Sequence, residues 1–220
     1  AHDRRTDEFL AMLAHELRNP LAPLRHAADL LRLTDAGDPR RSAIGNLVDR
    51  QVRHMSRLLD SLLDASRIAQ GKIKLELEPV ELVGLVTQVL EAARPTTEAR
   101  GLEVVLSAPK SELWTRGDAV RIAQIFESLV DNAAKFTDAN GTIRVRLQAE
   151  PQQAILSIAD TGNGIEPELL PRVFDLFMQG PRTLDRNQGG LGIGLSLVRN
   201  LTALHGGTVT AISPGIGQGS

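Results

Sequence analysis

Apolar residues recur at steps of three and four through the first seventy positions, a spacing that places them on one face of a helix. Two such series are present: Leu10, Leu13, Leu17, Leu21, Leu24, Ala28 and Leu31, then Ile44, Val48, Val52, Met55, Leu59 and Leu62. Turn-forming residues separate them at Asp35–Pro39, and Gly71 ends the second series. The pattern predicts an antiparallel helical hairpin. Because two helices enclose little apolar surface, we expect a second copy to complete a four-helix bundle, and therefore a homodimer.

The remaining residues mix strand-like and helix-like spacing. Period-two alternation predicts strands at Ile73–Glu78, Leu102–Leu106, Ile143–Leu147, Ala154–Ile158 and Thr208–Ile212. Helical spacing predicts helices at Leu82–Ala93, Ala119–Phe136 and Gly192–Leu204. This mixture predicts a sheet covered on one face by helices, a two-layer α/β sandwich. We therefore expect an α+β chain with one domain over residues 1–70 and a second over 71–220, the second lacking its last strand.

Composition excludes several classes of protein. The apolar fraction of 42% and charged fraction of 24% are ordinary for a globular protein, and the net charge of -2 argues against a nucleic-acid-binding surface. Without cysteine, disulfides, thiol catalysis and thiolate metal sites are excluded. No apolar run approaches the ~20 residues that cross a bilayer. We expect a cytoplasmic fragment of a longer protein, which leaves open a membrane anchor elsewhere.

His15 differs from an ordinary solvated histidine because of its neighbours. It lies off the leucine series, with Glu16 beside it and Asn19 one turn further on. Glu16 can orient the imidazole ring and take up its proton when the other ring nitrogen attacks an electrophile. Asn19 can hold a water molecule, and Pro20 removes a helical hydrogen bond and loosens the turn. The segment is a candidate nucleophilic site.

Two polar motifs occupy the second domain. Asn132 and Lys135 lie one turn apart on a predicted helix, where an amide oxygen can complete a magnesium shell and an ammonium can reach phosphates. Asp160 follows a predicted strand and precedes Gly162 and Gly164, so its carboxylate can accept a hydrogen bond from an exocyclic amine such as that of adenine. The glycines permit the base to approach the backbone closely. The alternatives remain that Asn132 and Lys135 form an ordinary polar helix end and that Asp160 lies in an ordinary loop.

A glycine-rich segment, Gly190, Gly192 and Gly194, opens the last predicted helix. Backbone N–H groups at a helix N-terminus favour an anion. A dinucleotide fingerprint is disfavoured, because that motif follows the first strand of a βαβ unit. Before it, Phe174 and Phe177 are expected to pack in the core, and the polar stretch 180–188 suits a lid over a nucleotide.

These motifs resemble those of a known protein family. Residues 15–21 resemble the phosphoacceptor box of histidine kinases, His-Glu-Leu-Arg-x-Pro-Leu. In chain order, the segments around Asn132, Asp160, Phe177 and Gly192 resemble the asparagine, first glycine, phenylalanine and second glycine boxes of that family's ATP-binding domain. DNA gyrase, the mismatch-repair ATPases and the heat-shock chaperone ATPases share this wider domain family.

The resemblance implies autophosphorylation of His15 from Mg-ATP, then transfer to an aspartate of a response-regulator receiver domain. By the same resemblance, Glu16 and Asn19 are expected to support dephosphorylation of that partner as well. Asn132 would carry Mg²⁺ and Asp160 would read adenine. The implied nucleotide-binding residues are Ser128, Asn132, Lys135, Phe136, Asp160, Gly162, Gly164, Ile165, Phe177, Gly190, Leu191, Gly192, Ile193, Gly194 and Leu195.

Ser128 departs from the family pattern, which usually has a second asparagine at this place. Serine offers a shorter oxygen, so contact with Mg²⁺ or phosphate is weakened or passes through water. Glu127 is rotated by about 100° around the helix and is a poor substitute. Two alternatives therefore stay open: a dimeric scaffold that binds ATP poorly, and an ATPase of the wider family without a phosphoacceptor role.

Overall fold

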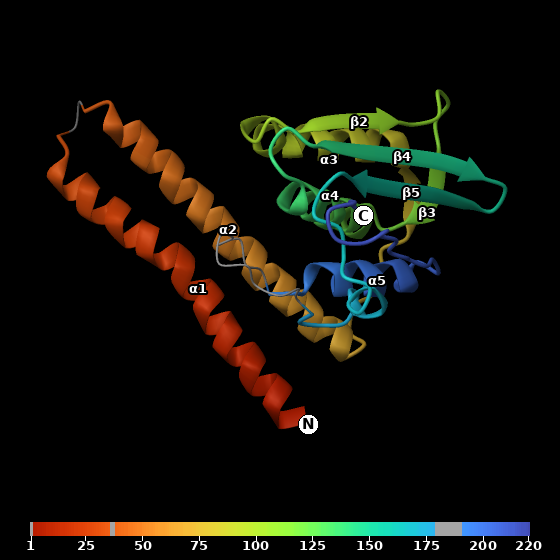
Figure 1. The fold of residues 1–220 in the computed structure, drawn as a ribbon, viewed down its shortest axis with the longest axis horizontal. Coiled ribbons are helices and arrows are strands. Elements are labelled where there is room, and N and C mark those ends of the chain that lie inside the picture. The colour runs from red at the N-terminus through yellow and green to blue at the C-terminus, as the bar shows by residue number, and fades with distance from the viewer. Residues whose placement is uncertain (1, 36–37, 179–190) are drawn as a thin grey trace. The chain divides into compact units, whose positions relative to one another are not determined.

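The computed structural model describes residues 2–35, 38–178 and 191–220 (Figure 1). The chain forms two compact units. One contains the N-terminal helices up to Gly71 and a short segment that ends at Ile193, and the other contains the remaining described residues from Lys72 onward.

The first unit is built from two long antiparallel helices, α1 (His2–Leu33) and α2 (Arg40–Ala69) (Figure 1). Pro20 and Pro23 lie inside α1, and the helix continues through both. The predicted apolar series divides into two sets. Ile44 is buried, whereas Leu21 and Leu59 remain about half exposed, at 50% and 46%. Ala28 is exposed, and its neighbour Ala27, which was not in the predicted series, is buried instead. The hairpin is therefore confirmed, and it leaves part of its apolar surface uncovered.

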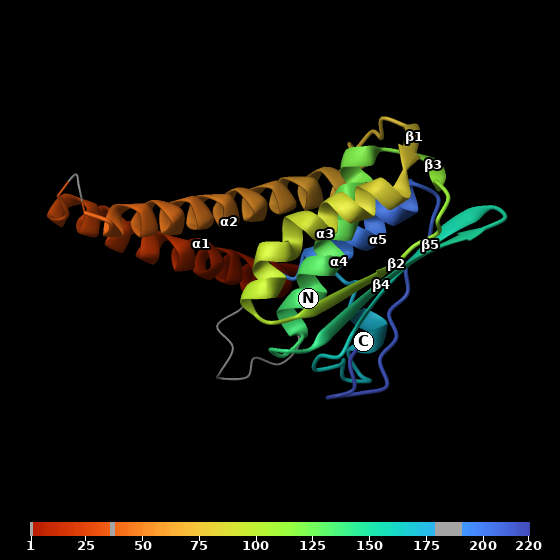
Figure 2. The same ribbon diagram turned by 90° about the horizontal axis from the view of Figure 1, so that it is seen from above.

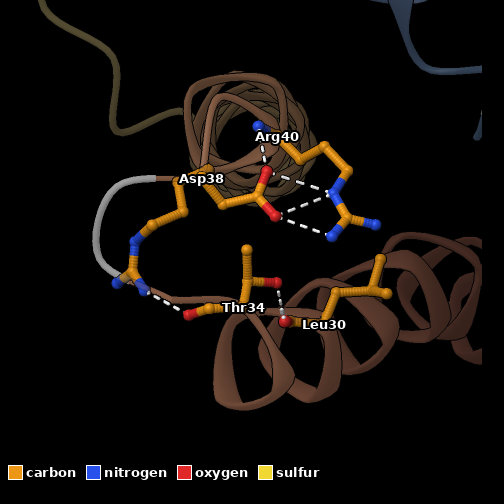
Figure 3. Close-up of polar contacts among 5 residues, drawn as sticks. Leu30, Thr34, Asp38 and Arg40 are labelled. Carbon is orange, nitrogen blue, oxygen red and sulfur yellow. Dashed lines mark hydrogen bonds and ion pairs between the residues drawn. The ribbon is translucent and has the colours of Figure 1, made fainter.

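Side chains close both sides of the hairpin turn (Figure 3). The Asp38 carboxylate accepts hydrogen bonds from the backbone N–H of Arg40 at 2.8 Å and from its guanidinium at 2.6 Å. This hydrogen bonding lowers the pKa of Asp38. At the end of α1, the Thr34 hydroxyl donates to the carbonyl of Leu30, and Arg41 donates to the carbonyl of Thr34 at 2.8 Å.

The second unit contains a two-stranded and a three-stranded sheet. Strand β1 (Glu78–Glu81) pairs antiparallel with β3 (Trp114–Gly117). The larger sheet has the order β2-β4-β5, in which β2 (Glu103–Ser107) is parallel to β4 (Thr142–Glu150) and β5 (Gln153–Asp160) is antiparallel to it. The helices α3 (Leu82–Ala99), α4 (Ala119–Phe136) and α5 (Gly194–Leu204) lie on one side of this mixed sheet (Figure 2). A short 3-10 helix, η1, spans Leu170–Arg172. The predicted α+β class is confirmed.

The core of this unit lies between the sheet and helices α3 and α4. Alternate residues of β4, Ile143, Val145 and Leu147, are buried because successive strand side chains point to opposite faces. They meet the apolar face of α4, formed by Ile122, Phe126, Val130 and Ala133. The opposite face of α4 carries the half-buried polar side chains that the sequence singled out, Ser128, Asn132 and Lys135.

Several predicted boundaries were wrong. Ile73–Glu78 does not form a strand; β1 begins at Glu78, and the N–H of Glu76 binds a carboxylate instead of a neighbouring strand. Thr208–Ile212 is not a strand either, because no described strand pairs with it. The last helix begins at Gly194 rather than Gly192, and β3 was not predicted at all. None of the described helices has the length and apolar character needed to cross a membrane.

Candidate active site

The candidate nucleophile lies on α1. The backbone of His15 and Glu16 is helical, and their side chains lie outside the described part of the structure. Asn19, one turn further on, is exposed, and Pro20 is fully buried. The proposed orientation of the imidazole ring by Glu16 therefore stays a prediction.

The second group of candidate residues lies on the last turns of α4. Asn132 and Lys135 are half-buried, and Phe136 is 45% exposed. The Lys135 ammonium lies 4.9 Å from the centroid of the Phe136 ring. No described residue forms a hydrogen bond with the side chain of Asn132. Its amide oxygen is therefore available to a cation, and a cation shared with phosphate oxygens fits this donor.

The end of α4 is held by residues from distant parts of the chain. Arg100 donates through Nη1 to the carbonyl of Ala134 and through Nη2 to that of Thr137, the latter at 2.8 Å. Thr137 is buried, and its hydroxyl donates to the carbonyl of Ala133 at 2.6 Å. Such bonds satisfy the carbonyls that a helix end leaves unpaired. Arg100 was missed by the sequence reasoning, and its isolated position in the sequence offered no signal.

The first glycine segment packs directly against α4. The N–H of Asn163 donates to the carbonyl of Phe136 at 3.1 Å. A Cβ on Gly162 would overlap this same carbonyl, and a Cβ on Gly164, whose φ is +67°, would overlap the carbonyl of Gly215. The sequence analysis attributed these glycines to the close approach of a base. In the structure, the chain's own backbone fills the space beside them.

Asp160 ends β5 at the edge of this segment. One carboxylate oxygen accepts the N–H of Gly162 at 2.8 Å, and the other accepts the hydroxyl of Ser220 at 2.5 Å. Ile165 donates its N–H to the hydroxyl of Ser213 at 2.9 Å. The bonds from Gly162 and Ser220 fix the orientation of the Asp160 carboxylate. An exocyclic amine that binds here must use the remaining lone pairs or displace the Ser220 hydroxyl.

The phenylalanine and second glycine segments are described only in part. Phe174 and Phe177 are half-buried and are absent from the core, so the prediction that they pack in the core was wrong. Phe177 has a φ of +66°, which places it in a turn rather than in a regular element. Gly190 and the predicted lid, residues 180–188, lie outside the described residues.

The remaining residues of the second glycine segment fall into different units. Leu191, Gly192 and Ile193 belong to the unit of the helical hairpin. Gly194 and Leu195 form the first turn of α5 in the other unit, where a Cβ on Gly194 would lie 2.9 Å from the hydroxyl oxygen of Ser128. Within that unit the structure thus places the start of α5 and the first glycine segment beside the polar face and the end of α4.

The described residues contain no group of three histidine or acidic side chains able to hold a metal ion. The groups described at this site are the amide of Asn132, the ammonium of Lys135 and the N-terminus of α5. Such a set suits a nucleotide whose phosphates bring their own cation.

Comparison with known proteins identifies the two regions. A family model of the His Kinase A (phospho-acceptor) domain matches residues 5–71, and one of the histidine kinase-, DNA gyrase B- and HSP90-like ATPase matches residues 117–220. The autoinducer 2 sensor kinase/phosphatase LuxQ of Vibrio cholerae is 36% identical over 216 residues, which cover 96% of this chain and 25% of LuxQ.

Two solved structures match nearly the whole length of this chain. The histidine kinase AdeS of Acinetobacter baumannii superposes with a TM-score of 0.67 at 25% identity, covering 94% of this chain and 93% of AdeS. Full-length ShkA in complex with AMPPNP gives a TM-score of 0.66 at 32% identity, covering 96% of this chain and 44% of ShkA. The chain therefore spans only part of the length of LuxQ and ShkA.

Proposed function

Because the chain belongs to the histidine kinase family, we propose that it uses Mg-ATP to phosphorylate its own His15 and passes the phosphoryl group to a response-regulator receiver domain. The observation that carries this proposal is the position of His15 in its seven-residue box, inside the residues matched by the phospho-acceptor model. The ATPase model, which matches the other unit, supports ATP as the donor.

The roles of the residues follow from their chemistry. Asp160 accepts the adenine amine, Lys135 neutralises phosphate charge, and the N-terminus of α5 at Gly194 faces an anion. Asn132 would hold Mg²⁺, which would neutralise charge on the transferred group. A ring nitrogen of His15 then forms a bond to the γ-phosphorus while the bond to the β–γ bridging oxygen breaks and ADP leaves. Glu16 receives the proton from the other ring nitrogen.

The second step transfers the phosphoryl group to an aspartate of the receiver domain, and His15 is restored. The name of LuxQ, a sensor kinase/phosphatase, supports a reverse activity as well. In that reaction Asn19 holds the water that attacks the phosphorylated aspartate. Its exposure on α1 suits contact with a partner protein.

Labelling with [γ-³²P]ATP tests the proposal and separates it from the alternatives. We expect label that is lost in acid and retained in alkali, and its absence in His15→Gln. Nucleotide binding should persist in this variant, because Asn132, Lys135 and Asp160 lie in the other unit from His15. A scaffold that binds ATP poorly would remain unlabelled. An ATPase without a phosphoacceptor would release phosphate without becoming labelled. Acid-labile label on His15→Gln would mean that another residue is the acceptor.

A further inference from the structure

Within the described part of the chain, one hydrogen bond joins the backbone of residues 72–77, the segment that leads into the second unit, to a side chain of that unit. Residues 72–77 form no strand, and Ile73 and Leu75 are half-buried. Among the described residues, the only acceptor for an N–H of this segment is Oδ2 of Asp118, which accepts from Glu76 at 3.1 Å. Asp118 is 8% exposed and Glu76 is exposed, so the bond is partly shielded from water.

Asp118 is joined to two other elements. Its Oδ1 accepts the N–H of Arg121 at 3.1 Å and caps the start of α4. Its own N–H donates to Nε2 of His205 at 3.0 Å, and Nδ1 of His205 lies 2.8 Å from the carbonyl of Leu201 in α5. Because a carbonyl only accepts, Nδ1 carries the proton and Nε2 is free to accept.

The residue before Asp118 makes room for this arrangement. A Cβ on Gly117 would lie 2.5 Å from Cδ1 of Ile122 and 3.1 Å from Cδ2 of His205. The histidine ring therefore packs in the space that a larger residue at position 117 would occupy. Gly117 also pairs with Glu78, the first residue of β1, so the anchored segment enters the sheet directly.

We propose that Asp118 is a positioning residue for phosphoryl transfer, which tethers the linker at Glu76 to the start of α4 and, through His205, to the end of α5. The proposal rests on the proposed function, because it concerns movement of the nucleotide-binding unit toward His15. With the tether in place, the linker that follows α2 ends at Leu75. The two helices that flank the nucleotide site are thereby joined to the point at which the linker leaves the unit.

The charge state of Asp118 suits this role. Burial raises the pKa of its carboxyl, but the N–H groups of Glu76 and Arg121 lower it, and the net shift is downward. The carboxylate is therefore ionised at neutral pH and accepts both N–H groups at once. Charge-assisted hydrogen bonds of this kind are stronger than neutral ones.

Loss of the tether lengthens the linker. The direction in which the linker enters the unit is then less closely fixed. The effective concentration of one linked group near another falls as the linker grows, and transfer also depends on orientation. We expect the autophosphorylation rate at saturating ATP to fall by roughly three- to tenfold, with the Kd for ATP changed by less than about twofold.

Two substitutions remove the tether from opposite ends. Asp118→Asn keeps one oxygen that can cap α4, since asparagine is an equally good N-cap, but its amide cannot accept both N–H groups. Glu76→Pro removes the donor and keeps an extended backbone. Glu76→Ala is the matched control, because it removes the exposed side chain and retains the N–H.

Hydrogen exchange of the peptide covering residues 72–77 and the labelling rate are measured for all three variants. We expect faster exchange and slower labelling in Asp118→Asn, and parental values of both in Glu76→Ala. Glu76→Pro has no N–H at position 76, so it is judged by labelling alone, which we expect to be slower. Unchanged exchange in Asp118→Asn, or a labelling rate that is unchanged or raised in either tether variant, would overturn the proposal. Exchange is measured without ATP. Absence of label on the parent chain would therefore contradict the proposed function, while exchange still decides whether the tether exists.

Discussion

Ser128 faces Gly194 where α4 and α5 meet, and this contact gives the serine a role apart from nucleotide chemistry. A Cβ on Gly194 would lie 2.9 Å from the Ser128 oxygen, so little space remains between the two positions. An asparagine, which the family usually has here, is longer and would need room that the start of α5 occupies. The small side chain therefore suits the close approach of the two helices.

Two substitutions on α4 are expected to differ in their effect on Mg-ATP affinity. Asn132→Asp places a negative charge beside the expected phosphates, and we expect Mg-ATP affinity to fall about tenfold or more, since roughly 1.4 kcal/mol corresponds to each factor of ten. Ser128→Ala keeps a small side chain, and we expect less than about a threefold change. Calorimetric titration with Mg-ATP measures both. Equal and severe losses would show that the Ser128 hydroxyl takes a full part in binding.

The sequence predicted the candidate site wherever a residue belongs to a short local motif. His15, Asn132 and Asp160 could be selected because the residues expected to act with each of them lie within a few positions along the sequence. Arg100 and Asp118 could not, since their partners Thr137 and Glu76 lie far from them along the chain. Contacts of this kind leave no periodic pattern.

Among the secondary-structure elements, α4 was predicted to the residue and the strands less well. Its apolar face recurs at helical spacing over the whole of Ala119–Phe136. A strand also needs a partner, which alternation alone does not provide. Residues 73–77 and 208–212 alternate without a pairing strand, whereas β3 is short and polar and pairs with β1.

The cap of α3 predicts how stability depends on pH. Glu81 accepts the N–H groups of Gly84 and Leu113, which lower its pKa, together with that of Val83. A carboxyl whose folded pKa is depressed contributes stability above its unfolded pKa and loses it as pH falls through the folded value. We expect Glu81→Gln to lower the thermal midpoint at pH 7. We also expect the midpoint of this variant to fall less steeply than that of the parent as the pH is lowered.

Thermal unfolding between pH 7 and pH 3 measures this effect. Glu78→Gln is the matched control, because Glu78 is an exposed residue of the same strand and caps no helix. A Glu81→Gln curve parallel to that of the parent would contradict the assigned role of the cap.

For the whole molecule, the uncovered apolar surface of the hairpin predicts association. Val52, Leu59 and Leu63 recur at heptad-like spacing on α2 and are 49%, 46% and 53% exposed. Fully burying a leucine contributes roughly 1.5–3 kcal/mol, so burying the exposed half of several such residues on each of two chains offsets an association cost of ~4–15 kcal/mol. We expect a dimer at tens of micromolar.

Light scattering of the parent chain, Leu59→Glu and Asn46→Glu tests this expectation. Leu59→Glu places a charge within the exposed apolar row, and we expect it to give a monomeric mass and a lower autophosphorylation rate. Asn46→Glu adds the same charge at an exposed polar position of α2 and should leave the dimer intact. Two chains are expected to associate because association buries this row. A parent chain that is monomeric and still labels His15 would therefore contradict the four-helix bundle.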